Sequence, residues 1–319
     1  MRTSWRANAQ ARTFGTERRR DDTPVSHVFV VIPVHGRSAY TAACLETLRR
    51  QRAAHTTVVV DDGSPDDTID LLQRDFPDVV LLPGDGRLWW SGGTNRGVAW
   101  ALGKAGCGDF VLTLNNDTLC PDGYLDSLTE AASATPHTIV GSVTVRADDP
   151  SIVVDGGMRI RWATAKFLPL HRGEDVALAY PQGGQVKVDT LSGCGMLIPV
   201  DAFGAVGMFD EQRLPQYAAD YEFACRAARA GYGLRICADV PLPQHAEATG
   251  LHAAVQSGSL GDLVHSLWNR RSANDLRTRL QFAHLACPRR LLVPYVLFDL
   301  LRVVGGSLRR FRQGSRRSR

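Results

Sequence analysis

Short apolar runs alternate with segments of helical spacing between residues 27 and 114, and this alternation constrains the fold more than any other feature. The run 27–33 ends at a proline, residues 40–51 carry apolar side chains at helical spacing, and 57–60 is a second apolar run. Helix and strand patterns then alternate at 68–74, 79–82, 94–102 and 110–114. Such alternation builds a sheet through right-handed crossovers. The sequence therefore predicts a three-layer α/β/α fold.

The rest of the chain is less regular. β-like pieces lie at 139–145, 152–155 and 186–191, and a helix is predicted over 220–230, where a glycine ends it. A further section at about 261–304 is helical and basic and contains two prolines as breaks. We therefore expect an open mixed sheet with a helical C-terminal extension.

The distribution of charge and cysteine limits the class of protein. The net charge is +4, but the tails 1–20 and 302–319 together carry +12, so the residues between them sum to −8. Basic tails on an acidic body suit anionic lipid and argue against a nucleic-acid binder. The seven cysteines include no C-x-x-C pair, which argues against a disulfide framework or a cysteine zinc site and favours a reducing, cytoplasmic environment.

Polar residues directly follow the predicted strands. His35 follows the first strand, Asp61 and Asp62 follow the second, and Asn-Asn-Asp at 115–117 follows a later one. In open α/β sheets ligands bind outside the carboxyl ends of the strands, so these residues are expected to meet at one edge. A dinucleotide-binding Rossmann fold would place G-x-G-x-x-G after the first strand, and none is present there.

Four segments, in their order and spacing, resemble the family 2 glycosyltransferases of GT-A fold. They are Val-Val-Ile-Pro-Val-His at 30–35, Val-Asp-Asp-Gly-Ser at 60–64, Leu-Asn-Asn-Asp at 114–117, and Phe-Asp-Glu at 209–211 followed by Ala-Asp-Tyr-Glu at 219–222. The resemblance covers about residues 27–250. It divides the chain into a basic, disordered arm (1–25), a catalytic domain (26–250, donor half 26–120, acceptor half 121–250) and a helical basic region (251–319).

The resemblance assigns the donor side of the site. Asp62 is expected to accept hydrogen bonds from the nucleotide base, because a carboxylate pairs well with the N–H of a pyrimidine ring. The backbone near Pro33 and Val34 is expected to wall this pocket, and Asn116 to contact the ribose. The residues alone leave an alternative open, since Asp-Gly-Ser-Pro is also ordinary turn chemistry.

The metal motif of the family is D-x-D, and this chain departs from it with Asn115-Asn116-Asp117. A Mg²⁺ or Mn²⁺ ion on a sugar diphosphate takes only one or two ligands from carboxylates, so Asp117 alone suffices. The resemblance adds His245 as a further ligand. An Asn-Asp turn and a structural histidine are the alternatives at these two positions.

The resemblance places the catalytic base at Asp220. In an inverting transfer the acceptor hydroxyl loses its proton as it attacks the anomeric carbon, and a carboxylate within hydrogen-bond reach accepts that proton. The glutamate that precedes the base in the family is Ala219 here. Asp220 is equally suited to cap the predicted helix, and the two roles are compatible.

Two further stretches are expected to form substrate surface. Trp89 and Trp90 precede a glycine turn, after which we expect a helix whose free N–H groups, with Asn95 and Arg96, bind the donor. Either tryptophan can stack on an acceptor sugar or simply fill the core. Gly193 and Gly195 resemble an acceptor-side turn, and a tight bend beside a buried strand is the alternative. 

The C-terminal section has an amphipathic pattern between residues 291 and 310, with arginines concentrated at its end. Its longest apolar stretch, 291–304, is broken by charges, and no apolar stretch follows the N-terminal arginines, so neither a membrane span nor a secretory signal is expected. A helix of this kind lies on an anionic leaflet, packs on the catalytic domain or contacts a second subunit.

Together these features predict a metal-assisted inverting glycosyltransferase at the inner face of the cell membrane. It would transfer a hexosyl unit, with rhamnosyl as a refinement, from a UDP- or dTDP-linked donor to a hydroxyl of a bacterial cell-surface or lipid-linked glycan. The competing hypothesis is a non-catalytic sugar-nucleotide-binding or scaffold protein that kept the fold, favoured by Asn115 and Ala219. A membrane-associated nucleic-acid binder ranks third.

Overall fold

A computed structural model describes residues 26–245, 267–269, 272 and 274–317, and the structural statements below concern these residues. A parallel core opens the sheet. Its strands are β1 (Val28–Val34), β2 (His55–Asp61), β3 (Val80–Pro83) and β4 (Phe110–Thr113). Each is continuous and largely apolar, as expected for strands covered on both faces. The four parallel strands of the predicted pattern are therefore present.

The second half of the sheet is mixed. It consists of β5 (Thr138–Arg146), β6 (Val153–Asp155), β9 (Gln185–Lys187), β10 (Met196–Pro199) and β11 (Gly233–Gln244). The strand order is β3-β2-β1-β4-β10-β5-β11-β9, and β6 pairs with β5. β10 runs antiparallel to β4 and β5, while β11 is parallel to β5. The carboxyl ends of β1, β2, β4, β5 and β11 consequently share one edge.

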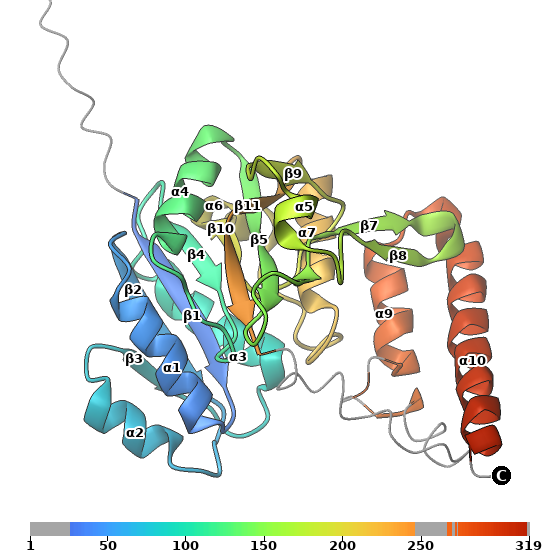
Figure 1. The fold of residues 1–319 in the computed structure, drawn as a ribbon, viewed down its shortest axis with the longest axis horizontal. Helices are drawn as coiled ribbons and strands as arrows, with labels where there is room; N and C mark the ends of the chain where they lie inside the picture. Colours follow the sequence, from blue (N-terminus) through green and yellow to red (C-terminus); the bar gives the residue numbers. More distant parts are fainter. Residues whose placement is uncertain (1–25, 246–266, 270–271, 273, 318–319) are drawn as a thin grey trace, which may run out of the picture.

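Helices cover both faces of the sheet (Figure 1). One face packs against α1 (Ser38–Arg49), α2 (Thr68–Asp75) and α4 (Tyr124–Ala134), and the other against α3 (Trp89–Leu102), α6 (Val200–Val206) and α7 (Ala219–Arg229). In β1, Val30 and Ile32 pack in the core under α1, α2 and α4, whereas Phe29 and Val31 pack in the core on the opposite face. This alternation follows from the two-residue period of a strand. It confirms the predicted three-layer α/β/α fold with a mixed sheet.

A hairpin and a pair of helices extend from the acceptor end of the sheet (Figure 1). They comprise β7 (Met158–Arg161), η1 (Trp162–Thr164), β8 (Lys166–Pro169), α9 (Leu276–Ala286), η4 (Arg289–Leu291) and α10 (Leu292–Arg317). The short helix α5 (Val176–Ala179) follows the hairpin in the chain and lies beside the sheet (Figure 1). Arg279 on α9 forms a 2.5 Å ion pair with the buried Asp299 of α10. Arg302 donates to the carbonyls of Thr164 and Ala165. The inner face of α10 therefore packs on the hairpin.

Some expectations about local structure were wrong or incomplete. The helix expected from Thr94 begins at Trp89, because the glycines of 92–93 lie inside it and let it approach β1: a Cβ at Gly93 would lie 3.0 Å from Pro33 Cβ. The strand β11 and the helix α4 were not predicted. The arm at 1–25 and residues 246–266 lie outside the described residues, so the domain division stays a prediction. Within the described ranges, no helix has the length and apolar content to cross a bilayer.

Candidate active site

The loops at the carboxyl edge of the sheet are tied together by short hydrogen bonds. The ring nitrogen Nδ1 of His35 pairs with the carbonyl of Asp62 at 2.8 Å, and the N–H of Gly36 donates to Ser64 Oγ at 2.6 Å. The N–H of His245 donates to the carbonyl of Asp117 at 2.9 Å. Residues far apart along the chain therefore meet at this edge, as the strand pattern predicted.

The adjacent Asp61 and Asp62 have different roles. Asp61 accepts the N–H of Ser64 at 2.9 Å, which is the turn chemistry considered as the alternative. Asp62 points the other way and accepts the N–H groups of Gly86 (2.8 Å) and Trp89 (3.0 Å), one on each carboxylate oxygen. A carboxylate offers about four lone-pair sites, so Asp62 keeps acceptor capacity while it fixes the following loop.

The start of α3 is fully hydrogen-bonded. Trp89 has a left-handed φ of 57°, and the carboxylate of Asp62 holds its N–H. The next two N–H groups donate to the side chain of Gln216 (3.2 Å) and the carbonyl of Pro215 (2.9 Å). The expectation that this helix start offers free N–H groups to phosphate was therefore wrong, because the acceptor half already occupies them.

Asn95 and Arg96 lie on the side of α3 that faces the acceptor-half residues 206–212. The side-chain amide of Asn95 donates to the carbonyl of Phe209 (2.9 Å) and to Glu211 (2.7 Å) and accepts the N–H of Phe209 (3.0 Å). With the exposed Arg96 it lines a surface cavity of about 870 Å³. Among the described residues, no hydrogen bond or ion pair joins either side chain to the carboxylates of Asp62, Asp117 or Asp220. Asn95 instead fixes the segment 209–211 to α3.

Trp90 links the donor and acceptor sides. Its indole Nε1 donates to Asn115 Oδ1 at 3.1 Å. On the other side, a Cβ at Gly193 would lie 2.3 Å from the Trp90 ring and 3.3 Å from the Cβ of Asp220. Only glycine fits between these two side chains. Asn115, which replaces the first acid of the D-x-D motif, is thus a hydrogen-bond partner of Trp90.

Asp117 is a buried carboxylate with weak partners. It is 3% exposed, and its nearest cation is Arg37 at 4.0 Å, with the Gln244 amide at 3.5 Å. Burial raises the pKa of Asp117, while Arg37 opposes the rise. The backbone bond to His245 brings that residue to the same place. An enclosed, poorly compensated carboxylate is a suitable ligand for a hard cation.

The protein offers few metal ligands at this edge of the sheet. No cluster of three or more His, Cys, Asp or Glu residues suited to a metal occurs in the described part of the chain. Asn116 donates its amide to Thr41 Oγ1 at 2.9 Å. The residues present therefore fit a cation held by Asp117 and His245, with the remaining ligands coming from a bound diphosphate and water.

Asp220 lies in the first turn of α7 and remains partly exposed. Its carboxylate accepts the N–H groups of Gly193 and Tyr221, both at 2.8 Å. Burial raises the pKa of Asp220 to about 6, partly offset by these hydrogen bonds. The residue before the helix is Ala218, with φ 67°, so Asp220 is not the N-cap considered as the alternative. Its carboxylate is oriented by the backbone of residue 193.

Gly195 does not face the site. It has a left-handed φ of 78°, and a Cβ there would lie 2.6 Å from Ser142 Oγ and 2.7 Å from the hydroxyl of Tyr124. Its surroundings are therefore filled by buried side chains. The tight bend beside a buried strand, which was the alternative for this turn, describes Gly195, whereas Gly193 contacts both Trp90 and Asp220.

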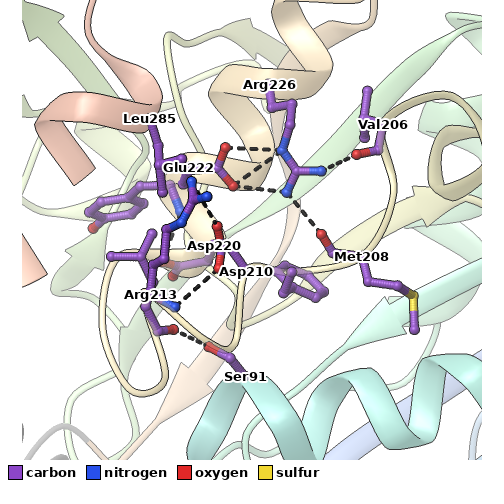
Figure 2. Close-up of polar contacts among 12 residues, drawn as sticks. Ser91, Val206, Met208, Asp210, Arg213, Asp220, Glu222, Arg226 and Leu285 are labelled. Atoms are coloured by element: carbon purple, nitrogen blue, oxygen red, sulfur yellow. Dashed lines mark hydrogen bonds and ion pairs between the residues drawn. The ribbon is translucent and has the colours of Figure 1, made fainter. Parts of the chain in front are cut away.

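An ion pair supporting α7 was missed by the sequence reasoning. Glu222 is 2% exposed and pairs with Arg226 at 2.8 Å. Figure 2 shows Arg226 between this carboxylate and the carbonyls of Val206 and Met208. The pair ties the helix that carries Asp220 to the loop that leads into residues 209–211. The sequence does indicate this pair, because Glu222 and Arg226 are four residues apart on one predicted helix.

The described chain has a three-layer α/β/α fold with buried or half-buried acids beside the carboxyl edge of its sheet. Two solved structures share the fold. A structure of GalNAc-T7 with UDP, GalNAc and Mn²⁺ aligns with a TM-score of 0.54 and 15% identity over 70% of this chain and 44% of that one. The mannosyltransferase PcManGT from Pyrobaculum calidifontis, in complex with GDP-Man and Mn²⁺, aligns with a TM-score of 0.53 and 19% identity over 88% and 73%.

Sequence comparisons specify the family. Residues 29–182 match the model of Glycosyl transferase family 2. N-acetylglucosaminyl-diphospho-decaprenol L-rhamnosyltransferases from two strains of Mycobacterium tuberculosis are 29% identical over 196 residues, which is 56% of this chain. The matched region spans 62% of the length of those relatives. Residues 29–182 therefore match the family 2 glycosyltransferases, and the chain shares the fold of the two solved structures.

Proposed function

We propose that this glycosyltransferase moves one hexosyl unit, with inversion, from a nucleoside diphosphate sugar to a hydroxyl group of a glycan acceptor. The observation that carries the proposal is the position of the Asp220 carboxylate. This group is a partly exposed carboxylate with a pKa of about 6, oriented by the Gly193 N–H and separated from Trp90 only by that glycine. At neutral pH such a group is mostly ionised yet basic enough to accept a proton.

With Asp220 as the base, every bond and proton in the transfer reaction is accounted for. The acceptor oxygen forms a bond to the anomeric carbon as its proton passes to Asp220. The bond between that carbon and the diphosphate oxygen breaks, and its electron pair leaves with the diphosphate. No covalent sugar–enzyme intermediate is required, in contrast to a retaining hydrolase with a nucleophilic carboxylate.

The donor is assigned to the edge beside Asp62 and Asp117. The spare acceptor capacity of Asp62 suits the N–H of a uracil or thymine base, with Pro33 and Val34 at the adjoining end of β1. We assign Mg²⁺ or Mn²⁺ to Asp117 and His245, and the ribose contact to Asn116. The ion would neutralise charge on the departing diphosphate. Mn²⁺ in both related structures supports this assignment.

For the sugar and the acceptor, we propose a rhamnosyl or related unit and a lipid-linked glycan. The support is the name of the Mycobacterium tuberculosis relatives, which contains both L-rhamnosyl and a diphospho-decaprenol acceptor. A role in bacterial surface-polysaccharide assembly follows. Trp90 lies between donor and acceptor sides, which suits it to stack on a sugar ring.

The test is a transfer assay followed by mass spectrometry. Purified enzyme with Mn²⁺ is given UDP-, dTDP- and GDP-linked sugars and an N-acetylglucosaminyl diphosphate lipid as acceptor. We expect turnover with one donor class and a loss of about 10²- to 10⁴-fold in Asp220→Asn with donor binding retained. Asp201→Asn, an exposed acid in the first turn of the neighbouring α6, is the matched control and should stay active.

The competing function is a non-catalytic sugar-nucleotide-binding protein. It predicts that calorimetry detects UDP or dTDP binding while no donor is turned over in the presence or absence of acceptor. The position of Asp220 beside Trp90 is the feature that favours an enzyme, because a pure binding protein has no need for a base of raised pKa there.

We also propose that α10 holds the enzyme on the inner face of the cell membrane. Its outer side exposes Val293, Leu297, Phe298 and Leu301, which are 46–70% exposed, while Tyr295, Asp299 and Val303 face the protein. The chain from 302 to 319 carries seven arginines and no acid. An apolar stripe followed by cationic residues is complementary to an anionic leaflet.

Vesicle sedimentation tests this attachment. We expect binding to phosphatidylcholine vesicles only when phosphatidylglycerol is included, with loss of binding in Leu297→Ser/Leu301→Ser. Leu178→Ser removes a leucine on α5 that is more exposed, at 82%, and is the control. Binding that is unchanged by the double substitution would assign this face to something other than lipid.

A further inference from the structure

A second acid, Asp155, belongs to the surroundings of the base. It ends β6, opposite Thr144 of β5, and is followed by two glycines. One carboxylate oxygen accepts the N–H of Gly157 at 2.8 Å. In the part of the chain that the structure describes, its carboxylate has no other hydrogen bond and no ion pair within 4.0 Å. One oxygen of a partly exposed acid is thus left without a protein partner.

Backbone contacts connect this acid to the segment that orients Asp220. Met158, three residues after Asp155, bridges to Thr190, and its carbonyl accepts the N–H of Asp189 at 2.9 Å. The hydroxyl of Thr190 donates to the carbonyl of Tyr221 at 3.0 Å, directly after the base. The turn that follows Asp155 and the first turn of α7, which carries Asp220, therefore both contact the segment 189–193.

The turn that carries Asp155 is rigid. The hydroxyl of Tyr180 donates to the carbonyl of Gly156 at 2.9 Å, and a Cβ at Gly156 would lie 2.4 Å from that hydroxyl oxygen. Gly157 has a left-handed φ of 96°, and a Cβ there would lie 2.6 Å from Val188 Cγ1. The backbone is enclosed on two sides, so the direction of the carboxylate is fixed.

The electrostatic surroundings of Asp155 are shared with the base. Burial is the main cause of the raised pKa of Asp155, Asp220 and Tyr221, and the negative charge of Asp155 adds to the rise at the other two. Two other groups face Asp155. The guanidinium of Arg172 lowers the pKa of Asp155. Tyr180 lies at the end of α5, and its pKa is raised by burial and by the charges of Asp155 and Glu174. Confining a carboxylate with a single hydrogen bond is costly, and nothing in the packing requires an acid here.

We propose that Asp155 binds a hydroxyl group of the acceptor sugar and holds the neighbouring, reacting hydroxyl against Asp220. A sugar presents adjacent hydroxyls, so two fixed carboxylates can engage two of them: Asp220 takes the proton of one, and Asp155 only accepts a hydrogen bond from the other. This inference rests on the proposed function. It makes Asp155 a determinant of acceptor specificity, since a carboxylate that is covered by the acceptor and left unpaired by a deoxy acceptor disfavours that acceptor.

The experiment compares wild type with Asp155→Asn, using the donor found active in the transfer assay and the N-acetylglucosaminyl diphosphate lipid. We expect the acceptor KM to rise about tenfold or more while the donor KM and donor hydrolysis without acceptor stay unchanged. The acidic limb of kcat/KM should move to lower pH, because Asp220 loses a like charge beside it. Asp148→Asn is the control, since that acid is exposed on the same connection and pairs with Arg146.

A set of acceptors lacking single hydroxyls sharpens the result. Wild type should reject one deoxy acceptor by about a hundredfold, and Asp155→Asn should accept the same compound nearly as well as the full acceptor. If Asp155→Asn does not fold, Asp155→Ser keeps an acceptor for the Gly157 N–H and is measured instead. If neither variant folds, Asp155 is a structural residue and the proposal is wrong.

Two outcomes separate this inference from the proposed function. A wild-type enzyme that transfers sugar while folded Asp155→Asn keeps its acceptor KM and its pH profile overturns the role of Asp155 alone. A wild-type enzyme that turns over no donor in the panel overturns the proposed function itself.

Discussion

The donor and acceptor halves of the sheet reach the same edge by different means. The donor half consists of consecutive parallel strands, and its acid Asp62 is held by N–H groups of the next loop. The acceptor half joins β5, β10 and β11 from distant parts of the chain, and Asp220 is held by residue 193. Asp62 thus organises its own loop, whereas the protonation of Asp220 depends on tertiary packing. Local pattern predicts the parallel strands that carry Asp62 to this edge, whereas the surroundings of Asp220 arise only in the assembled fold.

Gly193→Ala tests the contact between the halves, and among the substitutions that leave both acids in place its effect on the rate should be the largest. The added Cβ would lie 2.3 Å from the Trp90 ring, so Trp90 or Asp220 must move. A displacement of about 1 Å can cost about 10²-fold in rate, and we expect a loss of transfer of this size with UDP or dTDP affinity retained. The measurement is kcat together with calorimetry. Gly204→Ala, where a Cβ meets open space, should leave kcat unchanged.

Glu222→Gln tests whether the acceptor half depends on a buried ion pair. The substitution leaves Arg226 without its charge partner, and we expect the free energy of unfolding to fall by about 2–3 kcal/mol in urea denaturation. The exposed pair Glu46–Arg49 on the donor side is the comparison, and Glu46→Gln should cost less than about 0.5 kcal/mol. Equal losses in the two variants would remove the distinction between the halves.

Asp117→Asn tests the metal assignment on the donor side. We expect Mn²⁺ to strengthen UDP or dTDP binding in wild type. In the variant, the factor by which Mn²⁺ increases this affinity should be about tenfold smaller, a change of about 1.4 kcal/mol. Calorimetry with and without Mn²⁺ measures it. Because burial raises the pKa of Asp117, the folded variant should be no less stable than wild type near neutral pH. Undiminished Mn²⁺ enhancement in the variant would place the ion elsewhere.

The stability of Asp220→Asn relative to wild type should depend on pH. The unfolded chain releases the Asp220 proton near its usual pKa of 3.8, while the folded chain holds it until about pH 6. Wild-type stability should therefore fall relative to the variant as pH rises through this window. After the weakened hydrogen bonds are subtracted, we expect a net gain of about 1 kcal/mol in the variant at pH 8, measured by denaturant unfolding. A gain that appears only below pH 4 would contradict the raised pKa.

Sequence reasoning recovered the donor half because its strands and helices are local and periodic. It also placed the helix of Asp220 within one residue, from the helical pattern and the glycine that ends it. It failed at Trp89, whose left-handed backbone is held by Asp62 from the loop that follows β2. It missed Asp155, since nothing near that residue indicates that the turn packs against 188–193. Roles that arise from long-range packing were beyond the reach of local patterns.

The most direct test of the account is the pH dependence of kcat/KM for sugar transfer. With Asp220 as the base, the rate should rise with pH through a midpoint of about 6 and then level off, because only the ionised carboxylate accepts the hydroxyl proton. The same midpoint must vanish in Asp220→Asn together with most of the rate. A midpoint near 4, or an Asn variant that retains the wild-type rate within a few fold, would contradict the assignment of Asp220 as the catalytic base.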